Sequence, residues 1–305
     1  METSGTEWIA VDWGTTRLRC WLVGSAGEVL KSMSSEDGMG SLKPNEFEPA
    51  LLKLLGDDLQ ADRQVSTIAC GMVGARQGWT EAAYVAVPCY PPDCTNATFA
   101  PVADKRLRVI ILPGLSQTEP ADVMRGEETQ IAGYLANYPN FRGTLCLPGT
   151  HTKWVKIDGG QIRSFTTFMT GDLFAAITRH TVLRHSIDFD WDDQAFDNAV
   201  DEALRAPDSV SALLFNLRAG DLLENRNTGF ANARASGLLM GLELAGARTY
   251  WEAKDIALVG SEQLCTRYAR ALEIAGQKAT LTDGDHMVLS GLKSAYASLA
   301  ITDGS

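Results

Sequence analysis

The most informative stretch of the sequence is Trp8-Ile-Ala-Val-Asp-Trp-Gly-Thr-Thr-Arg-Leu-Arg-Cys-Trp-Leu-Val-Gly24. Two runs rich in β-branched and aromatic residues, 8–12 and 18–23, lie on either side of a Gly-Thr-Thr turn, and glycines from Gly24 to Gly27 end the second run. This pattern predicts a β-hairpin. Its turn would present backbone N–H groups and threonine hydroxyls, which are donors that suit an anion.

A second stretch, 144–162, follows the same plan. A short run at 144–147 leads to a Gly-Thr turn, a lysine follows, and two glycines close the next run. At nearly the same offset, Gly14-Thr15 matches Gly149-Thr150, and Gly27-Glu28-Val29 matches Gly160-Gln161-Ile162. A repeat at this distance is too long for a solenoid and predicts two domains of related topology, each opening with a hairpin. We place them at 1–139 and 140–305, with the linker near 139–143.

The rest of the chain alternates between strands and helices. We expect strands at 65–70, 107–113 and 255–259, and helices at 46–55, 122–138, 171–186, 209–224, 230–248 and 262–275. The proline-rich segment 81–106 predicts irregular surface structure, and the acidic stretch from Asp188 to Asp197 is expected to be a solvated face or a mobile insertion. This alternation favours α/β domains with mixed sheets over a β-sandwich.

Composition narrows the class of protein. The 305 residues are 45% hydrophobic and 21% charged, a balance typical of globular proteins. With 27 basic and 38 acidic residues the net charge is −11, which argues against a nucleic-acid partner. No apolar run is long enough to span a membrane, and the acidic start of the chain does not resemble a signal peptide.

The six cysteines do not indicate a metal site. Only Cys89 and Cys94 lie close in sequence, and the four histidines do not complete a finger-like ligand set. Reduced cysteines in a cytoplasmic protein are therefore expected. The sequence does not determine the oligomeric state, and a homodimer is compatible with it.

Two common nucleotide motifs are absent from the sequence. No Gly-x-x-x-x-Gly-Lys-Ser/Thr occurs, which excludes a P-loop, and no Gly-x-Gly-x-x-Gly follows the first strand. What remains is a pair of Gly-Thr turns, one in each expected domain. Such a pair could hold a triphosphate from both sides.

At this point the motifs resemble a known superfamily. Val-Asp12-Trp-Gly14-Thr15-Thr16-x-x-Arg resembles the first phosphate motif of the ATPases related to actin, hexokinase and the heat-shock chaperones. Pro-Gly149-Thr150-His-Thr152-Lys153 stands where the second phosphate motif is expected, and Leu-Val-Gly260-Ser261 resembles the adenosine motif. The resemblance implies two ribonuclease H-like (actin-like ATPase) domains with mixed sheets and a nucleotide cleft between them.

Within that superfamily the sequence is similar to the 2-dehydro-3-deoxygalactonokinase family. The similar blocks, in chain order, are Asp-Trp-Gly-Thr-Thr-Arg-Leu-Arg, Cys-Gly-Met-Val-Gly-x-Arg-Gln-Gly-Trp, Met-Arg-Gly-Glu-Glu-Thr-Gln, Leu-Pro-Gly-Thr-His-x-Lys-Trp-Val, Phe-Met-Thr-Gly-Asp-Leu-Phe and Ser-Gly-Leu-Leu-Met-Gly-x-Glu-Leu. They extend from residue 8 to about residue 262. The resemblance implies an ATP- and Mg²⁺-dependent kinase that phosphorylates the terminal hydroxyl of 2-dehydro-3-deoxy-D-galactonate in galactonate catabolism.

The resemblance also implies roles for individual residues on the nucleotide side. Asp12 would orient Mg²⁺, through water, in the first domain. The residues implied in ATP and phosphate binding are Gly14, Thr15, Thr16, Arg17, Gly149, Thr150, His151, Thr152, Lys153, Gly260 and Ser261. For Lys153, an ordinary solvated strand residue is an equal alternative. The second domain would be the nucleotide-binding part, with the last helix packing back on the first domain.

The first domain would bind the acceptor. Glu127, after Gly126 near a helix start, matches the position of the general base in related sugar kinases, and Glu128 is the neighbour that could replace it. Two adjacent helical side chains point about 100° apart, so only one of them can face the substrate. The acceptor is an anion, and the residues implied in binding it are Arg76, Gln77, Gly78, Trp79, Tyr84 and Arg125, with the two arginines as candidates for its carboxylate.

Two alternatives stay open at this stage. Another sugar, sugar acid or polyol could be the acceptor, because acceptor choice rests on a few pocket contacts. A nucleotide-switched actin-like ATPase would use the same phosphate motifs without an acceptor.

Overall fold

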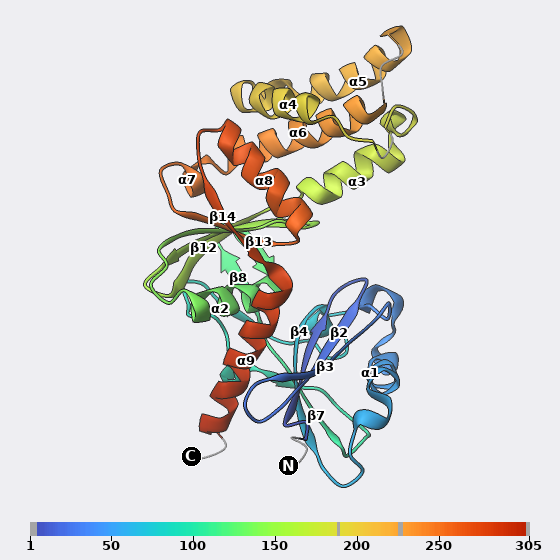
Figure 1. Cartoon of the computed structure of the whole chain (residues 1–305), viewed down its shortest axis with the longest axis vertical. Coiled ribbons are helices and arrows are strands. Elements are labelled where there is room, and N and C mark those ends of the chain that lie inside the picture. The colour runs from blue at the N-terminus through green and yellow to red at the C-terminus, as the bar shows by residue number, and fades with distance from the viewer. Residues whose placement is uncertain (1–4, 188–189, 225–227, 303–305) are drawn as a thin grey trace. The chain divides into compact units, whose positions relative to one another are not determined.

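The computed structural model describes residues 5–187, 190–224 and 228–302. The chain divides into two compact units (Figure 1). Unit 1 comprises Met1–Phe141, Gly159–Arg163 and Gly284–Ser305, and unit 2 comprises Arg142–Asp158 and Ser164–Asp283. The last helix, α9 (Gly284–Thr302), therefore belongs to unit 1 although it follows unit 2 in the sequence.

Unit 1 is built on a six-stranded mixed sheet in the order β3-β2-β1-β4-β7-β6. Its strands are β1 (Trp8–Trp13), β2 (Leu18–Val23), β3 (Val29–Ser35), β4 (Val65–Gly71), β6 (Thr98–Phe99) and β7 (Leu107–Ile111). The hairpin β1–β2 and its extension β3 are antiparallel, whereas β1, β4 and β7 run parallel. The carboxyl ends of β1 and β4 consequently lie together at one edge of the sheet.

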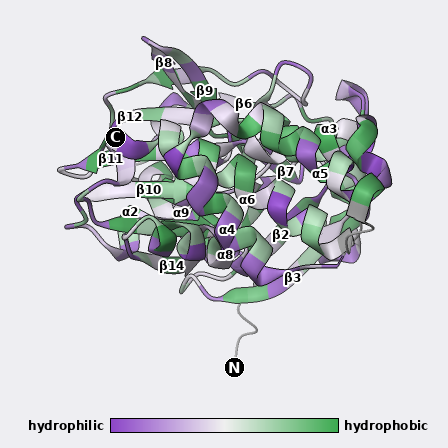
Figure 2. Cartoon of the chain, turned by 90° about the horizontal axis from the view of Figure 1, so that it is seen from above, coloured by the Kyte–Doolittle hydropathy of each residue, from purple (hydrophilic) through white to green (hydrophobic). Residues whose placement is uncertain are grey.

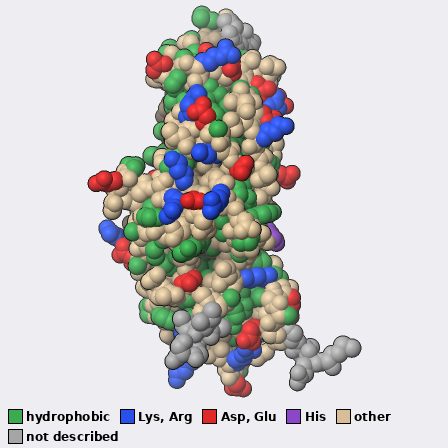
Figure 3. Space-filling model, turned by 90° about the vertical axis from the view of Figure 1, so that its left-hand side faces the viewer, with side chains coloured by type: hydrophobic (Ala, Val, Ile, Leu, Met, Phe, Trp, Pro, Cys, Tyr) green, Lys and Arg blue, Asp and Glu red, His purple; other side chains and the backbone are tan. Residues whose placement is uncertain are grey.

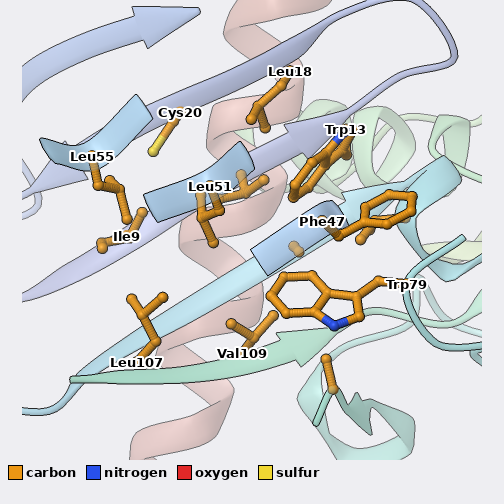
Figure 4. Close-up of a cluster of buried hydrophobic side chains, with 14 of the residues drawn as sticks. Ile9, Trp13, Leu18, Cys20, Phe47, Leu51, Leu55, Trp79, Leu107 and Val109 are labelled. Atoms are coloured by element: carbon orange, nitrogen blue, oxygen red, sulfur yellow. The ribbon is translucent and has the colours of Figure 1, made fainter. Parts of the chain in front are cut away.

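Side chains that alternate along β1 enter two different cores. Ile9, Val11 and Trp13 pack against α1 (Phe47–Leu55), whose Phe47, Leu51 and Leu55 recur at helical spacing. Figure 4 shows this cluster, with the rings of Trp13, Phe47 and Trp79 beside one another. On the opposite face, Trp8 and Ala10 pack against apolar residues of α9.

A small three-stranded sheet leads the chain to the helix α2 (Glu127–Asn137). Its order is β5-β8-β9, from Tyr84–Ala86, Gly114–Thr118 and Ala121–Met124. Helix α2 packs closely on α9. The approach is so close that a Cβ at Gly291 would clash with the Thr129 backbone, and a Cβ at Gly133 would clash with the Met287 backbone. These glycines allow the two helices to approach.

Unit 2 is built on a five-stranded sheet in the order β12-β11-β10-β13-β14, in which only the first residues of β12, 161–163, belong to unit 1. The strands are β10 (Gly143–Leu147), β11 (Thr152–Asp158), β12 (Gln161–Phe168), β13 (Ile256–Gly260) and β14 (Ala279–Asp283). As in unit 1, an antiparallel pair (β10–β11) is extended by a third strand, and the first strand pairs parallel with the next one inward. The repeated plan read from the two hairpins therefore corresponds to a repeated sheet.

The helices of unit 2 are α3 (Thr170–His180), α4 (Asp193–Arg205), α5 (Val210–Glu224), α6 (Thr228–Gly246), α7 (Arg248–Trp251) and α8 (Glu262–Ile274). Helices α4 and α6 pack so closely that a Cβ at Gly241 would lie 2.7 Å from the Val200 carbonyl oxygen. Figure 2 shows hydrophobic and hydrophilic residues interleaved along these helices, as expected when one face is buried.

The structure corrects several predicted elements. The helix expected at 122–138 begins only at Glu127, because β9 occupies 121–124 and Gly126 adopts a positive φ of 112°. In the acidic stretch, Asp190, Asp192 and Asp193 are exposed, as expected for a solvated face, and Asp192 also caps α4 by accepting a hydrogen bond from the Ala195 backbone N–H at 2.9 Å. Asp188 lies outside the described residues.

Other elements were missed from the sequence. The third strands β3 and β12, and the short strands β5 and β6 within 81–106, were not expected. The remaining predicted strands and helices are present with shifted ends, and the expectation of α/β units with mixed sheets is confirmed.

Two surface properties bear on the class of protein. Within the described ranges, no helix combines the length and apolar character that crossing a membrane requires. On the face seen in Figure 3, basic and acidic side chains are interspersed and do not form one basic patch.

Candidate functional site

In unit 1, Asp12 lies at the carboxyl end of β1, next to Cys70 and Gly71 at the end of β4. Its side chain is only 13% exposed. Arg19, directly opposite on β2, donates to Asp12 Oδ2 through Nε at 3.1 Å and through Nη2, and it also pairs with Asp285 in the first turn of α9. Burial raises the pKa of the Asp12 carboxyl, and Arg19 partly opposes that rise.

The Gly14–Thr16 turn follows Asp12, and its two threonines are exposed. The segment 38–40 supports it: the Met39 N–H donates to the Gly14 carbonyl at 3.0 Å, and the Gly40 N–H donates to the Thr15 carbonyl at 2.8 Å. Because that segment bonds the turn's carbonyl oxygens, the threonine hydroxyls remain available to a ligand. Arg17 is exposed and forms an ion pair with Glu36 at 3.4 Å.

The start of α2 approaches the same edge of the sheet. Gly71 and Gly126 both have positive φ angles, and a Cβ on Gly126 would lie 3.4 Å from Gly71 Cα. Such close backbone approach places Glu127 and Glu128 beside the strand end that carries Cys70, whose Sγ lies 3.7 Å from Asp12 Oδ1.

The two glutamates have different environments. Glu128 is 1% exposed, and both of its carboxylate oxygens accept from the Gly126 N–H, at 2.8 and 2.7 Å. Burial raises the pKa of Glu128 to about 8. Glu127 is only half-buried, and its Oε2 accepts from the Arg125 N–H at 3.1 Å. Of the two, Glu127 is the carboxylate that a substrate can reach.

Arg125 is held in an unusual position. Its Nη2 donates to the Ala82 carbonyl at 2.7 Å, and its guanidinium carbon lies 4.3 Å from the centre of the Tyr84 ring. Its Nε and Nη1 are buried and have no hydrogen-bond partner in the part of the chain that the structure describes. Orphaned buried donors of this kind are rare unless a ligand satisfies them.

The other residues expected to bind the acceptor lie in different surroundings. Arg76 and Gln77 are exposed, and Arg76 Nε lies 3.4 Å from Glu81 Oε1. Trp79 is a core residue, because its ring packs on Phe47 and its Nε1 donates to the Pro101 carbonyl at 3.2 Å. Gly78 is buried, and a Cβ there would clash with the Val73 backbone, so a glycine is needed for the chain to pass at this point.

In unit 2, the Gly149–Thr150 turn lies just after the carboxyl end of β10, and Gly260 is the last residue of the parallel neighbour β13, with Ser261 directly after it. The start of α3 packs on this turn: the Asp172 N–H donates to the Thr150 carbonyl at 3.1 Å, and a Cβ on Gly171 would lie 2.7 Å from the Gly149 oxygen. His151 is exposed, with Nε2 2.7 Å from Asp172 Oδ2. A helix N-terminus and a Gly-Thr turn at the carboxyl ends of parallel strands are features that phosphate sites in other proteins combine, and this turn with the start of α3 is called the phosphate-type site below.

Thr152 and Lys153 do not face solvent beside this turn. Thr152 is buried, with Oγ1 2.8 Å from the Tyr268 hydroxyl, and Lys153 is 4% exposed, with Nζ 3.4 Å from the His151 carbonyl oxygen. The structure therefore does not present either side chain on the surface, where a phosphate group could contact it directly.

A mostly apolar pocket adjoins the turn within unit 2. It is lined by Gly149, Thr170, Gly171, Phe174, Ser236, Leu239, Met240, Leu264, Arg267 and Tyr268. The Arg267 guanidinium also stacks on Trp191, 3.9 Å from the ring centre. A flat, largely apolar group attached to phosphates would suit a pocket that opens beside a phosphate-type turn.

Sequence reasoning gave no role to three charged residues of these sites, namely Arg19, Asp285 and Glu243, although Arg19 and Glu243 stand within the quoted motifs. The hairpin register offered a signal for Arg19, because pairing across the Gly14 turn places it opposite Asp12. Glu243 is an acidic residue within an apolar helical run, which is itself a signal of a special role.

Two units that repeat the same mixed sheet, each with a Gly-Thr turn at the strand ends, define an actin-like ATPase fold of the sugar-kinase type. The sequence model of the family described as 2-keto-3-deoxy-galactonokinase matches residues 12–295, and the chain belongs to this family.

Relatives extend over nearly the whole chain. The chain is 41% identical over 303 residues to a protein of Rhizobium meliloti (strain 1021) named "Probable 2-dehydro-3-deoxygalactonokinase", covering 97% of this chain and 98% of the relative. It is 32% identical over 291 residues to the 2-dehydro-3-deoxygalactonokinase of Escherichia coli (strain K12), covering 94% and 96%. A crystal structure of a Sinorhizobium meliloti protein matches with a TM-score of 0.89 at 40% identity, covering 95% and 96% of the two chains.

Proposed function

We propose that this chain transfers the γ-phosphoryl group of ATP to the terminal (6-) hydroxyl of 2-dehydro-3-deoxy-D-galactonate. The observation that carries the proposal is the start of α2, where a reachable carboxylate, Glu127, adjoins a guanidinium with unsatisfied buried donors, Arg125. A sugar-acid kinase needs this combination, because its acceptor presents a hydroxyl to be deprotonated and a carboxylate to be bound.

The acceptor carboxylate would bind Arg125 through Nε or Nη1, the two nitrogens that the described chain leaves without partners. These two N–H groups point to different sides of the guanidinium, so the carboxylate would accept a charge-assisted hydrogen bond from one of them and not a side-on pair. Tyr84 and the Ala82 carbonyl hold the guanidinium in place. Arg76, exposed and paired with Glu81, is the weaker candidate for this role.

Glu127 would be the general base. In the reaction it takes the proton from the 6-hydroxyl, the 6-oxygen forms a bond to the γ-phosphorus, and the bond from that phosphorus to the β,γ-bridging oxygen breaks to release ADP. Glu128 would have a supporting role, since its carboxylate is buried and occupied by the Gly126 N–H.

The nucleotide phosphates would contact Gly14, Thr15 and Thr16 in unit 1 and Gly149 and Thr150 in unit 2. Exposed hydroxyls and the α3 N-terminus are suitable donors for them. The apolar pocket beside Gly149 would accept the base of the nucleotide. His151, Arg17, Gly260 and Ser261 would lie at the edges of these contacts.

Asp12 fits the magnesium role only as a single carboxylate. The described residues include no group of three or more His, Cys, Asp or Glu side chains able to hold a metal, and Arg19 occupies Asp12 Oδ2. Mg²⁺ keeps several waters and takes other ligands from phosphates, so one carboxylate that acts through water is sufficient. When bound, the ion would neutralise charge on the transferred phosphoryl group.

The test is a coupled ADP-release assay with Mg-ATP and purified chain. The acceptors are 2-dehydro-3-deoxygalactonate, its gluconate epimer, and a small panel of sugars and polyols. Turnover on the galactonate acid well above the others is the expected result. Preference for another acceptor would change the proposed substrate, and ATP hydrolysis that no acceptor stimulates would favour a nucleotide-switched ATPase.

A further inference from the structure

A buried carboxylate lies behind the Gly149–Thr150 turn of unit 2. Glu243, on α6, is 2% exposed. It accepts hydrogen bonds from Trp154 Nε1 at 2.7 Å, from the Tyr268 hydroxyl at 2.8 Å and from the Thr170 hydroxyl. All three donors are neutral, so no ion pair in this group offsets the cost of burying the charge.

Each of these donors belongs to an element that shapes the phosphate-type site. Thr170 is the first residue of α3, whose Gly171 packs on the turn and whose Asp172 N–H bonds the Thr150 carbonyl. Tyr268 belongs to α8, and its hydroxyl also lies 2.8 Å from Thr152 Oγ1 of β11. Thr170 and Tyr268 also line the apolar pocket.

The two carboxylate oxygens of Glu243 accept hydrogen bonds from different donors. Oε1 accepts from Trp154 on β11, while Oε2 accepts from both Thr170 and Tyr268. One atom therefore joins the start of α3 to α8, which supply two walls of the pocket. An apolar side chain at this position could fill the space but could not accept any of these bonds.

We propose that Glu243 is a positioning residue that holds the start of α3 and the Tyr268 wall in the arrangement that binds the nucleotide. This role rests on the proposed kinase function. In this role Glu243 does not contact a phosphate but still determines the affinity for the nucleotide. Acceptor binding depends on residues of unit 1, so it should not depend on Glu243.

The decisive variant is Glu243→Gln. Its amide has only one acceptor oxygen, so whichever way the amide turns, the NH₂ group faces at least one of the three donors and cannot accept from it. We expect the Kd for ATP, measured by calorimetry, to rise about tenfold, as loss of hydrogen bonds to a charged group implies. The melting temperature at pH 8 should change little, because removal of the buried charge offsets the cost of leaving a buried donor unpaired.

Glu202→Gln is the matched control. It makes the same chemical change on α4 of unit 2, where Glu202 pairs with Arg234 on α6. Its Kd for ATP should equal that of the unaltered chain. If Glu243→Gln binds ATP as tightly as this control, the positioning role is wrong and Glu243 is merely structural.

Tyr268→Phe provides an independent variant should Glu243→Gln fail to fold. It removes the hydroxyl that links Glu243 to Thr152 while keeping the ring, so it should weaken ATP binding in the same direction. Unchanged ATP affinity in a folded Tyr268→Phe chain would also overturn the proposal. Absence of ATP binding by the unaltered chain would instead refute the proposed kinase function.

Discussion

At the scale of single residues, the two adjacent glutamates of α2 separate into a reachable carboxylate and a buried one. Glu127→Gln should lower kcat by about 100-fold or more, because general bases commonly contribute that much, while the Kd for ATP changes less than about twofold. Steady-state kinetics and calorimetry on the same preparation measure both. Glu128→Gln is the comparison variant, and a larger loss of kcat there would transfer the base role to Glu128.

Arg125 and Arg76 offer a second contrast between neighbouring candidates. Arg125→Lys should raise the KM for the acceptor about tenfold or more, because lysine lacks the fixed planar N–H donors by which the guanidinium can bond Ala82 and the acceptor at once. Arg76→Lys should change that KM less than about twofold, since this side chain is exposed and paired with Glu81. Acceptor saturation curves at constant Mg-ATP decide between them, and the reverse order of effects would assign the carboxylate to Arg76.

At the scale of elements, burial of Glu128 at the start of α2 makes stability depend on pH. Its pKa is raised from 4.5 to about 8 in the folded chain, so the folded state holds the proton more tightly than the unfolded state. The resulting stability is fully present below pH 4.5 and is lost as the pH rises through 8, a change on the order of a few kcal/mol.

Denaturant unfolding of the unaltered chain and of Glu128→Gln, at pH 5.5 and pH 8, tests this effect. The unaltered chain should lose more stability between these two pH values than the variant does. Equal losses would mean that Glu128 titrates near its ordinary pKa despite its burial.

The same scale shows what the sequence could and could not reveal. Hairpins at 8–23 and 144–158 were predictable, because β-rich runs meet at glycine turns. The start of α2 was placed too early, at 122, because β9 occupies 121–124 and pairs with β8 through contacts that no local pattern encodes. Trp79 looked like a sugar-lining residue within a motif, and only the packing of α1 on the sheet makes it a core residue.

Among the candidate site residues, those in local motifs were predictable from the sequence, whereas those that meet only in the folded chain were not. Asp12, the Gly-Thr turns and the Glu127–Glu128 pair could be picked out from motifs, because turn chemistry is local. The hairpin register also indicates Arg19 as the partner of Asp12, but the contacts of Asp285 with Arg19 and of Tyr268 and Thr170 with Glu243 arise only through tertiary packing. The orphaned nitrogens of Arg125 are likewise a property of the folded environment and have no sequence signature.

At the scale of the whole molecule, the proposed roles assign the two ligands to different sets of residues, and hydrogen exchange can distinguish them. A bound ligand stabilises the state that binds it by RT ln(1 + [L]/Kd), and protection is greatest where the ligand contacts the backbone. Mg-ADP alone should slow exchange at 12–16 and 149–172, whereas the acceptor alone should slow exchange at 74–84 and 125–128.

Helix α1, on the sheet face of unit 1 that packs Trp13, is the internal reference and should respond little to either ligand. Mass-spectrometric exchange on the full chain, with each ligand at about 100 times its Kd, provides about 3 kcal/mol of stabilisation and hence a measurable effect. Protection of 74–84 by the nucleotide without protection of 149–172 would exchange the two roles. The proposal that unit 2 binds the nucleotide is therefore tested by the pattern of exchange protection, which activity measurements alone would not reveal.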